Sequence, residues 1–214
     1  LMQYYRKNCV IYIKNGFTSQ MNTILKRTLD FALSLLGLII MSPLFAIIYI
    51  LQKTCNPGKA IYRQERIGKG GKPFMILKFR TMKEEAEKDG VPQLAERDDE
   101  RLTSFGKWLR KHHLDELPQL WNVLRGDMAF IGPRPERKYF IDKIMEHDPR
   151  YELLYQIRPG VTSYATLYNG YTDTIEKMLR RLELDLYYLE HQSLWFDMKI
   201  LIKTFLKIVV GKKI

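Results

Sequence analysis

Phe31–Leu51 reads FALSLLGLIIMSPLFAIIYIL, and this stretch decides which class of fold the 214-residue chain can adopt. It contains no charged residue and matches the length of a helix that crosses a bilayer, which needs about 20 apolar residues. Helices in the core of a soluble protein rarely run this far without a charge. The stretch therefore predicts a membrane-embedded helix, and an ordinary transmembrane span is the simplest interpretation.

The Ser42-Pro43 pair inside the stretch favours a helix that enters the membrane and returns to the same side. Proline removes a backbone donor and clashes with the preceding turn, so it kinks or breaks a helix. The Ser42 hydroxyl is a nearby partner for backbone carbonyls that lose their own. From Phe31 to the break the helix would rise roughly 16 Å, about half of a hydrocarbon core that is ~30 Å thick.

Basic residues flank the stretch on both sides, at Lys26, Arg27, Lys53, Lys59 and Arg63. The preference of positive charge for the cytoplasmic side of a membrane draws both ends to that side. The sequence therefore favours a re-entrant membrane helix hairpin over residues 22–54, broken at Ser42-Pro43. Lys26, Arg27 and Asp30 would then lie among lipid headgroups where the hairpin enters.

A second membrane element is predicted near the end of the chain, at residues 193–214. In Leu194–Val210, LWFDMKILIKTFLKIVV, three lysines four residues apart (Lys199, Lys203 and Lys207) form one face of a helix whose other faces are apolar. This pattern is typical of an amphipathic helix in the membrane interface. A helix docked on the protein core, with its lysines in water, would show the same pattern.

Between these elements lies a body that we expect to be mostly α with a small β element, an α+β fold, preceded by an N-terminal extension at 1–21. Periodicity and turn residues predict a strand at 73–82, a charged loop at 83–101, helices at 102–111, 117–125 and 175–190, two helices within 136–157 broken at Pro149, and a turn at 158–160.

The formal net charge of +11 indicates a surface that attracts phosphate groups, whether of nucleic acid, nucleotides or anionic lipids. Nucleic acid is the weakest of these candidates, because the basic residues are dispersed and no aromatic stacking motif appears. The two cysteines, Cys9 and Cys55, lie far apart and provide neither a disulfide framework nor a zinc-ligand spacing.

Two adjacent carboxylates, Asp115 and Glu116, open the segment LDELPQLWNVLR at Leu114–Arg125. One interpretation is a well-formed helix start, because Asp is a favoured N-cap, Glu suits the first turn, and Pro118 is tolerated there. The apolar face of that helix, expected in the core, comprises Leu117, Leu120, Trp121 and Leu124. The other interpretation is that the helix holds a carboxylate for chemistry.

The surrounding cations favour the chemical interpretation. In GPRPE, Gly132–Glu136, Pro135 keeps Arg134 out of the helical region, so a stiff backbone presents one guanidinium, a group that binds phosphate through a planar fork. Four more cations end or flank structured segments: Lys78, Arg80, Arg110 and Arg158. Carboxylates and fixed cations beside a membrane suit a phosphate-bearing substrate and a divalent metal.

Taken in order, these residues resemble the bacterial sugar transferase family, the monotopic phosphoglycosyl transferases that start lipid-linked glycan assembly. Each short motif is weak alone, whereas their order and spacing together are highly specific. From about Asn22 the matches comprise Lys26, Arg27 and Asp30, Ser42-Pro43, Gln64–Met82, Phe105–Arg110, Leu114–Met128, Gly132–Glu136 and Arg158–Thr162, followed by Asp185, Tyr188, Ser193, Asp197, Lys199 and Ile200.

The resemblance implies a mechanism and a set of partners. Asp115 would attack the sugar-bearing phosphorus of a UDP-sugar, releasing UMP, and undecaprenyl phosphate would then take the phosphosugar from the aspartyl enzyme. Glu116 would assist in metal binding or proton handling, with Mg²⁺ at Asp115 and Glu116. Arg134 would grip phosphate, and the remaining cations, Lys78, Arg80, Arg110 and Arg158, would be supporting anion contacts.

The resemblance also implies that residues 55–192 are a cytoplasmic catalytic domain on the inner membrane of a bacterium, where they carry out the first membrane step of glycoconjugate synthesis. The chain looks like the small form of the family, without an additional N-terminal membrane domain, and a homodimer is compatible with the sequence but not required by it. A membrane-anchored polybasic scaffold without chemistry is the alternative from a different class.

Two departures from the family pattern leave the donor open. His113 stands where the family often has Ser or Thr. After Arg158–Thr162 the run Ser163–Thr172 keeps Asn169-Gly170 but has Tyr171 where the family usually has Arg. Preference for the sugar and the nucleotide is therefore not predicted.

Overall fold

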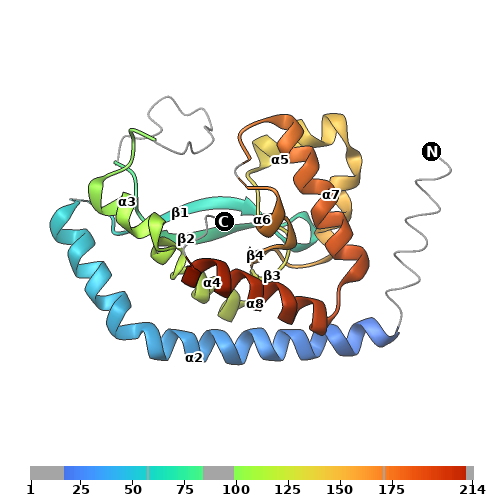
Figure 1. Ribbon diagram of the computed structural model, residues 1–214, viewed down its shortest axis with the longest axis horizontal. Coiled ribbons are helices and arrows are strands. Elements are labelled where there is room, and N and C mark those ends of the chain that lie inside the picture. The colour runs from blue at the N-terminus through green and yellow to red at the C-terminus, as the bar shows by residue number, and fades with distance from the viewer. Residues whose placement is uncertain (1–16, 57, 84–98, 171, 211–214) are drawn as a thin grey trace.

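The computed structural model describes residues 17–56, 58–83, 99–170 and 172–210, so most of the predicted charged loop at 83–101 lies outside the described residues. The described part is mostly helical with two small sheets, as expected for an α+β body (Figure 1). The helices are α2 (Phe17–Cys55), α3 (Ser104–Lys111), α4 (Gln119–Arg125), α5 (Lys138–His147), α6 (Tyr164–Tyr168), α7 (Ile175–His191) and α8 (Leu194–Val210), with 3₁₀ turns η1 (Lys69–Gly71), η2 (Leu114–Glu116) and η3 (Pro149–Gln156). The strands are β1 (Ile61–Ile67), β2 (Pro73–Phe79), β3 (Ala129–Ile131) and β4 (Gly160–Thr162).

Helix α2 is continuous through Pro43, so the predicted break is a bend (Figure 1). It runs along the lower edge of the molecule and turns upward at its far end. Pro43 cannot donate to the Ile39 carbonyl, and the Ser42 hydroxyl donates to that oxygen instead, at 2.8 Å. The satisfied carbonyl explains why the helix continues. Whether the bent helix enters and leaves a membrane on one side stays a prediction.

The side of α2 that faces the protein carries a row of buried polar residues, here called the polar stripe, beside apolar contacts from Leu44, Phe45 and Ile48. Asp30, Ser34 and Gln52 are buried there together with Ile48, at helical spacing. The other sides are apolar and exposed, from Ile24 through Ile39 and Ile40 to Leu51. Thr23–Cys55 is long and apolar enough to cross a membrane, and only 11% of its most apolar window is buried. This distribution supports membrane association, because a soluble helix of this kind would bury its apolar side.

The residues at the start of α2 bind the protein body, and their place among lipid headgroups stays a prediction. Lys26 forms an ion pair with Asp197 on α8. Arg27 donates to the carbonyls of Val123 at 2.6 Å and Leu124 at 2.7 Å, which end α4. The Asp30 carboxylate accepts the backbone N–H of Phe130 at 3.2 Å. These three motif residues therefore dock the membrane helix on the body.

Helix α8 presents an exposed apolar side and turns two of its three lysines toward the body. Lys203 donates to the Tyr168 hydroxyl at 2.9 Å, and Lys207 to the Leu167 carbonyl at 2.5 Å. The exposed apolar residues are Trp195, Met198, Ile202, Phe205 and Leu206, whereas Ile200 is buried. Lys203 and Lys207 of the predicted stripe thus face α6, whereas Lys199 lies over the exposed Trp195 ring. The exposed apolar side is what an interfacial helix presents to lipid.

Two sheets of two strands organise the body. β1 and β2 pair antiparallel, from Ile61 opposite Phe79 to Ile67 opposite Pro73. β3 and β4 pair parallel, so the predicted turn at 158–160 leads into a strand. Helices α5 and α7 and the η3 turn enclose the largest core cluster, which contains Ile141, Leu182 and Leu186. The second helix predicted within 136–157 is the 3₁₀ turn η3, beginning at Pro149 as expected.

Candidate functional site

The acidic pair lies on a 3₁₀ turn between α3 and α4. His113 connects α3 to this turn in the left-handed conformation, with φ of 55°, and among the described residues other than glycine only His113 has positive φ. Leu114 and Leu117, on either side of the pair, pack beside Phe79 of β2 and Leu109 of α3. The N-cap of α4 is Pro118, so the expectation that Asp115 caps this helix is wrong.

Lys78 of β2 binds one member of the pair. Its ammonium donates to the Glu116 carboxylate at 2.6 Å. Burial opposes ionisation of Glu116, but the charges of Lys78 and Arg134 and the hydrogen bond from Lys78 lower its pKa to about 2. Burial and the negative charge of Glu116 raise the pKa of Asp115, and Lys78 and Arg110 partly offset this rise. Asp115 is thereby the more basic of two adjacent carboxylates.

Three of the five predicted cations act on this pair. Lys78 and Arg134 stabilise the charge on Glu116, and Lys78 and Arg110 stabilise the charge on Asp115. The Arg110 Nε also donates to the Thr81 hydroxyl at 3.1 Å, just beyond β2. The local arrangement is therefore two carboxylates among positively charged side chains, which is the electrostatic setting that holds a phosphate group near a nucleophile.

The other two predicted cations bind elsewhere in the body. Arg80 is buried and donates to the Asn56 carbonyl at 2.6 Å, just beyond α2. Arg158 donates to the Gly126 carbonyl at 2.8 Å. Burial and the charge of Arg27 lower the pKa of Arg158, and Asp30 opposes this effect. Arg158 thus belongs to the docking region of α2 in this structure rather than to the acidic pair.

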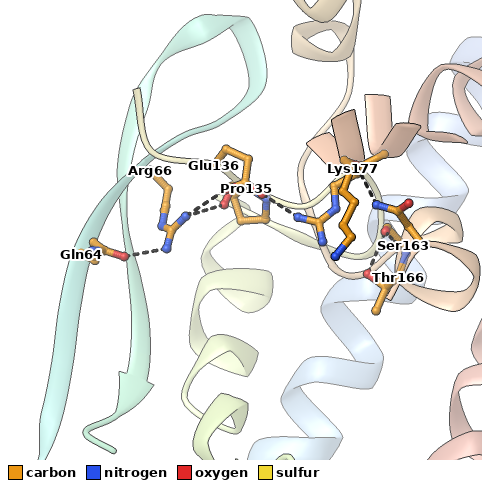
Figure 2. A network of polar contacts seen from close by, with 9 residues as sticks. Gln64, Arg66, Pro135, Glu136, Ser163, Thr166 and Lys177 are labelled. Atoms are coloured by element: carbon orange, nitrogen blue, oxygen red, sulfur yellow. Dashed lines mark hydrogen bonds and ion pairs between the residues drawn. The ribbon is translucent and has the colours of Figure 1, made fainter. Parts of the chain in front are cut away.

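The loop that carries Arg134 is clamped from both sides (Figure 2). Arg66 donates to the Pro135 carbonyl at 3.1 Å and to the Glu136 carboxylate at 3.4 Å, and Gln64 accepts from Arg66 at 2.6 Å. Arg181 of α7 donates to the second Glu136 oxygen at 2.9 Å. The role of Arg181 was not predicted, because an arginine on a regular helix carries no local signal, whereas Gln64 and Arg66 lie in a matched motif.

A close backbone approach completes this clamp. Gly132 and Gly160 face each other across the β3–β4 pair, and a Cβ on Gly132 would lie 2.3 Å from the Arg158 carbonyl oxygen. Real Cβ atoms do not come this close to a backbone oxygen, so only glycine fits. The Gly160 N–H donates to the Pro133 carbonyl at 2.9 Å. Gly132, the first residue of GPRPE, therefore fixes the backbone of the loop against β4, two residues before Arg134.

Helix α4 faces the body with different residues from those predicted. Gln119, Asn122 and Val123 are buried. Asn122 accepts the backbone N–H of Leu77 at 3.0 Å and donates to the Met75 carbonyl at 2.8 Å, so it pairs with the edge of β2 as a strand would. Trp121 of the predicted apolar face is half exposed, and that face turns toward α2. Of the expected core face, Leu117 packs on the core, and Leu117 and Leu120 line a groove with α2.

The acidic pair offers hard oxygen ligands for one divalent cation. Within the described residues no group of three or more His, Cys, Asp or Glu side chains could hold a metal ion. Mg²⁺ is commonly held by one or two carboxylates together with substrate phosphates, so two adjacent carboxylates fit such an ion when phosphate is present. The donor set of Asp115 and Glu116 is consistent with Mg²⁺ and does not match the nitrogen and sulfur ligands of zinc sites.

The described structure is a helical body that holds a buried Asp115 and a partly buried Glu116 among cations and is docked on a long exposed apolar helix, which suggests membrane association. The chain belongs to the bacterial sugar transferase family, whose model matches residues 21–211. This match includes every candidate site residue named above and agrees with the resemblance seen in the sequence motifs.

Curated relatives carry specific names. UDP-glucose:undecaprenyl-phosphate glucose-1-phosphate transferase of Escherichia coli (strain K12) is 41% identical over 196 residues, covering 91% of this chain and 42% of the relative. UDP-N-acetylgalactosamine-undecaprenyl-phosphate N-acetylgalactosaminephosphotransferase of Aeromonas hydrophila is 38% identical, over 87% of this chain and 44% of the relative. A relative from Caulobacter vibrioides, with the same name as the E. coli relative, is 42% identical over 84% of this chain and 67% of the relative. The chain thus spans less than half the length of the first two relatives.

Proposed function

We propose that this chain is a phosphoglycosyl transferase that moves a sugar phosphate from a UDP-sugar to undecaprenyl phosphate. The observation that carries the proposal is the buried Asp115, beside an ionised Glu116 and facing the charges of Lys78 and Arg110. Relatives named for this reaction, with two different sugars, support the donor and acceptor classes. The sugar itself stays open.

In the first half-reaction an Asp115 carboxylate oxygen attacks the phosphorus that bears the sugar. The new bond joins that oxygen to phosphorus, the bond between phosphorus and the bridging oxygen breaks, and UMP leaves with the bonding electrons. In the second half-reaction a phosphate oxygen of undecaprenyl phosphate attacks the same phosphorus and frees the Asp115 carboxylate. A carboxylate is an established covalent nucleophile for phosphoryl groups. The raised pKa of Asp115 makes its ionised form a better nucleophile than an ordinary aspartate.

The surrounding side chains supply position and charge, which phosphoryl transfer needs most. Lys78 holds Glu116, and the clamped Gly132–Glu136 loop holds Arg134 toward the negative charge that builds on the phosphoryl oxygens. Asp115 and Glu116 would hold Mg²⁺, which neutralises phosphate charge when bound. Lys78 and Arg110 keep the deprotonated form of Asp115 accessible.

The proposed location is the cytoplasmic face of the bacterial inner membrane, at the first membrane step of glycoconjugate synthesis. UDP-sugars are soluble, whereas only the phosphate of the acceptor is polar, so the site must lie at headgroup level. The bent α2 at 22–54 and the exposed side of α8 at 193–214 would place the catalytic body at 55–192 at this level. The exposed apolar residues on both helices support this placement.

The test replaces Asp115 by Asn and follows both half-reactions. Purified protein in detergent micelles receives a UDP-sugar labelled in the sugar, Mg²⁺ and undecaprenyl phosphate. Wild-type protein should release UMP rather than UDP and carry label when the acceptor is omitted. Asp115→Asn should lose more than about a thousandfold in turnover and carry no label, since the nucleophile is missing.

Asp142→Asn is the matched control, because Asp142 is exposed on α5 and pairs with Lys138 away from the site. It should keep wild-type rates. Release of UDP would indicate direct glycosyl transfer instead. Near wild-type turnover of Asp115→Asn would exclude the aspartyl mechanism, and no donor consumption by wild-type protein across a panel of UDP-sugars would favour the scaffold alternative.

A further inference from the structure

An apolar groove lies where the bend of α2 meets α4. Its volume is about 540 Å³, within the range of small-molecule sites. The residues used below are Leu38, Met41, Phe45 and Ala46 on α2 and Leu117 and Leu120 at α4. These side chains are apolar, and the groove is open on the side where α2 is exposed.

The bend at Pro43 gives the groove its shape without adding polarity. Figure 1 shows α2 bending, and the groove residues of α2 lie on both sides of Pro43 in the sequence, from Leu38 to Ile50, with Leu117 and Leu120 as the other wall. Ser42 also lines the groove, but its hydroxyl already donates to the Ile39 carbonyl. Both polar groups at the bend are thereby satisfied, so the groove suits a ligand segment that offers no hydrogen bonds.

The groove begins one residue from the acidic pair. Leu117 is part of its wall and directly follows Glu116. Phe45, another wall residue, packs in the same cluster as Leu117 beneath the turn that carries Asp115. A cationic site for a phosphate and an apolar groove for a chain therefore adjoin. Together they complement an amphiphile with an anionic head and a long apolar tail.

We propose that this groove binds the isoprenoid chain of polyprenyl phosphate next to its phosphate and so positions the acceptor for attack. The inference rests on the proposed function and extends it by assigning an acceptor site. A single-chain phosphate monoester fits one apolar groove whose wall residue Leu117 adjoins the acidic pair and its cations, and relatives named for undecaprenyl phosphate support this choice over a phospholipid. Phospholipid occupancy is one outcome of the test.

The test fills the groove by Ala46→Phe. Ala46 lines the groove, and its matched control, Ala32→Phe, adds the same ring at an exposed position of α2 that does not line it. Acceptor titrations in mixed micelles should show kcat/KM for undecaprenyl phosphate reduced about tenfold by Ala46→Phe and unchanged by Ala32→Phe. The rate of UMP release without acceptor should be the same in all three proteins, because the donor site is untouched.

A photoreactive polyprenyl phosphate, with a diazirine in its first isoprene units, gives a readout that does not need turnover. It should label peptides containing Leu38–Ile50 or Leu117–Leu120, and Ala46→Phe should reduce this labelling. Labelling competed equally by a phosphatidylglycerol vesicle and by undecaprenyl phosphate would assign the groove to bulk lipid and overturn the proposal. Equal acceptor kinetics of the two variants, or equal loss of both half-reactions in Ala46→Phe, would also overturn it. Specific labelling without any UMP release would instead retain the groove and remove the proposed function.

Discussion

Helices α2 and α7 bury opposite kinds of surface. On α7, Leu182, Leu186 and Leu189 face the core, and charged residues such as Glu183 face outward. On α2, Asp30, Ser34 and Gln52 face the body, and an almost unbroken apolar surface faces outward. Helix α7 follows the pattern of a soluble protein, with apolar residues inward and charged residues outward. Helix α2 shows the reverse pattern. One chain therefore uses two solvents, water around α7 and, by our proposal, lipid around α2.

The inversion shows what can hold a helix to a body in lipid. Apolar contact gives little driving force there, because lipid tails are as apolar as the side chains, so hydrogen bonds and close packing must contribute more. The ion pair of Lys26 with Asp197, the Arg27 contacts with the end of α4 and the Asp30 bond to Phe130 are contacts of this kind. Asp197 also accepts from the buried Tyr188 hydroxyl at 2.6 Å, which joins α2, α7 and α8 in one network.

The largest expected effect is on the α7 side of the comparison. Leu182→Ala removes a fully buried side chain and should lower the free energy of unfolding by about 2–5 kcal/mol. Ile40→Ala deletes a similar side chain from the exposed surface of α2 and should change it by less than about 0.5 kcal/mol. Thermal unfolding in detergent, followed by tryptophan fluorescence, measures both. Equal losses would show that the α2 surface is buried and that the inversion is wrong.

The next effect concerns Asp185, the buried carboxylate that departs from the apolar pattern of α7. Its burial, with Glu136 nearby and despite Arg181, raises its pKa to about 8. The folded state therefore holds one more proton than the unfolded state between about pH 4 and 8. Stability from this proton is complete below pH 4 and is lost as the pH rises through 8, by at most about 1.4 kcal/mol per pH unit.

Asp185→Asn should remove this pH dependence, because the amide stays neutral throughout. Unfolding temperatures between pH 5.5 and 8.5 should fall in the wild-type protein and stay level in the variant. Asp142→Asn, which changes an exposed aspartate, should keep the wild-type slope. A slope that persists in Asp185→Asn would assign the titration to another group.

A third prediction tests the polar stripe of α2 directly. Asp30→Leu makes the helix more apolar, yet it should destabilise the protein by about 1–3 kcal/mol, because the buried N–H of Phe130 loses its acceptor. Asp30→Asn keeps an oxygen at the same place and should cost less. Chemical unfolding in micelles compares the two variants. A protein stabilised by Asp30→Leu would show that apolar burial, not polar docking, holds α2.

The sequence predicted what local patterns encode. Residue type and spacing predicted three features: the apolar length of α2, the helix at 175–190 and the end of α4 at Gly126. Gly126 has a φ of 95°, as expected of a glycine that ends a helix. Adjacent prolines and charges also led to the acidic pair and Arg134, whose charge acts on Glu116 in the structure; their roles stay a prediction. These features depend on residues that are neighbours along the chain.

Features that depend on distant partners were missed or misplaced. The side of α2 that is buried depends on which residues of the body it meets, and a uniformly apolar segment offers no contrast to show it. The parallel β3–β4 pair has three residues per strand, too few for a periodic signal. The sequence shows the charge of Arg158 but not its contact with the Gly126 carbonyl or the nearby charge of Arg27. Its role as an anion contact stays a prediction.

The smallest expected effect is at the bend of α2, where Ser42 serves the carbonyl that Pro43 leaves without a donor. Ser42→Ala removes this bond and should lower the free energy of unfolding by about 0.5–1.5 kcal/mol.

Pro43→Ala restores the backbone donor and should straighten the helix, which favours a span over a re-entrant path. Single cysteines at the exposed positions Ile24 and Lys53, in a protein whose Cys9 and Cys55 are replaced by Ser, are labelled from outside sealed inverted vesicles whose cytoplasmic face is exposed. Both should react in the protein with the native bend and in Ser42→Ala. Loss of reaction at one of them in Pro43→Ala, with Ser42→Ala unchanged, would show that the bend sets the topology, whereas opposite accessibility in the wild-type protein would show that α2 spans.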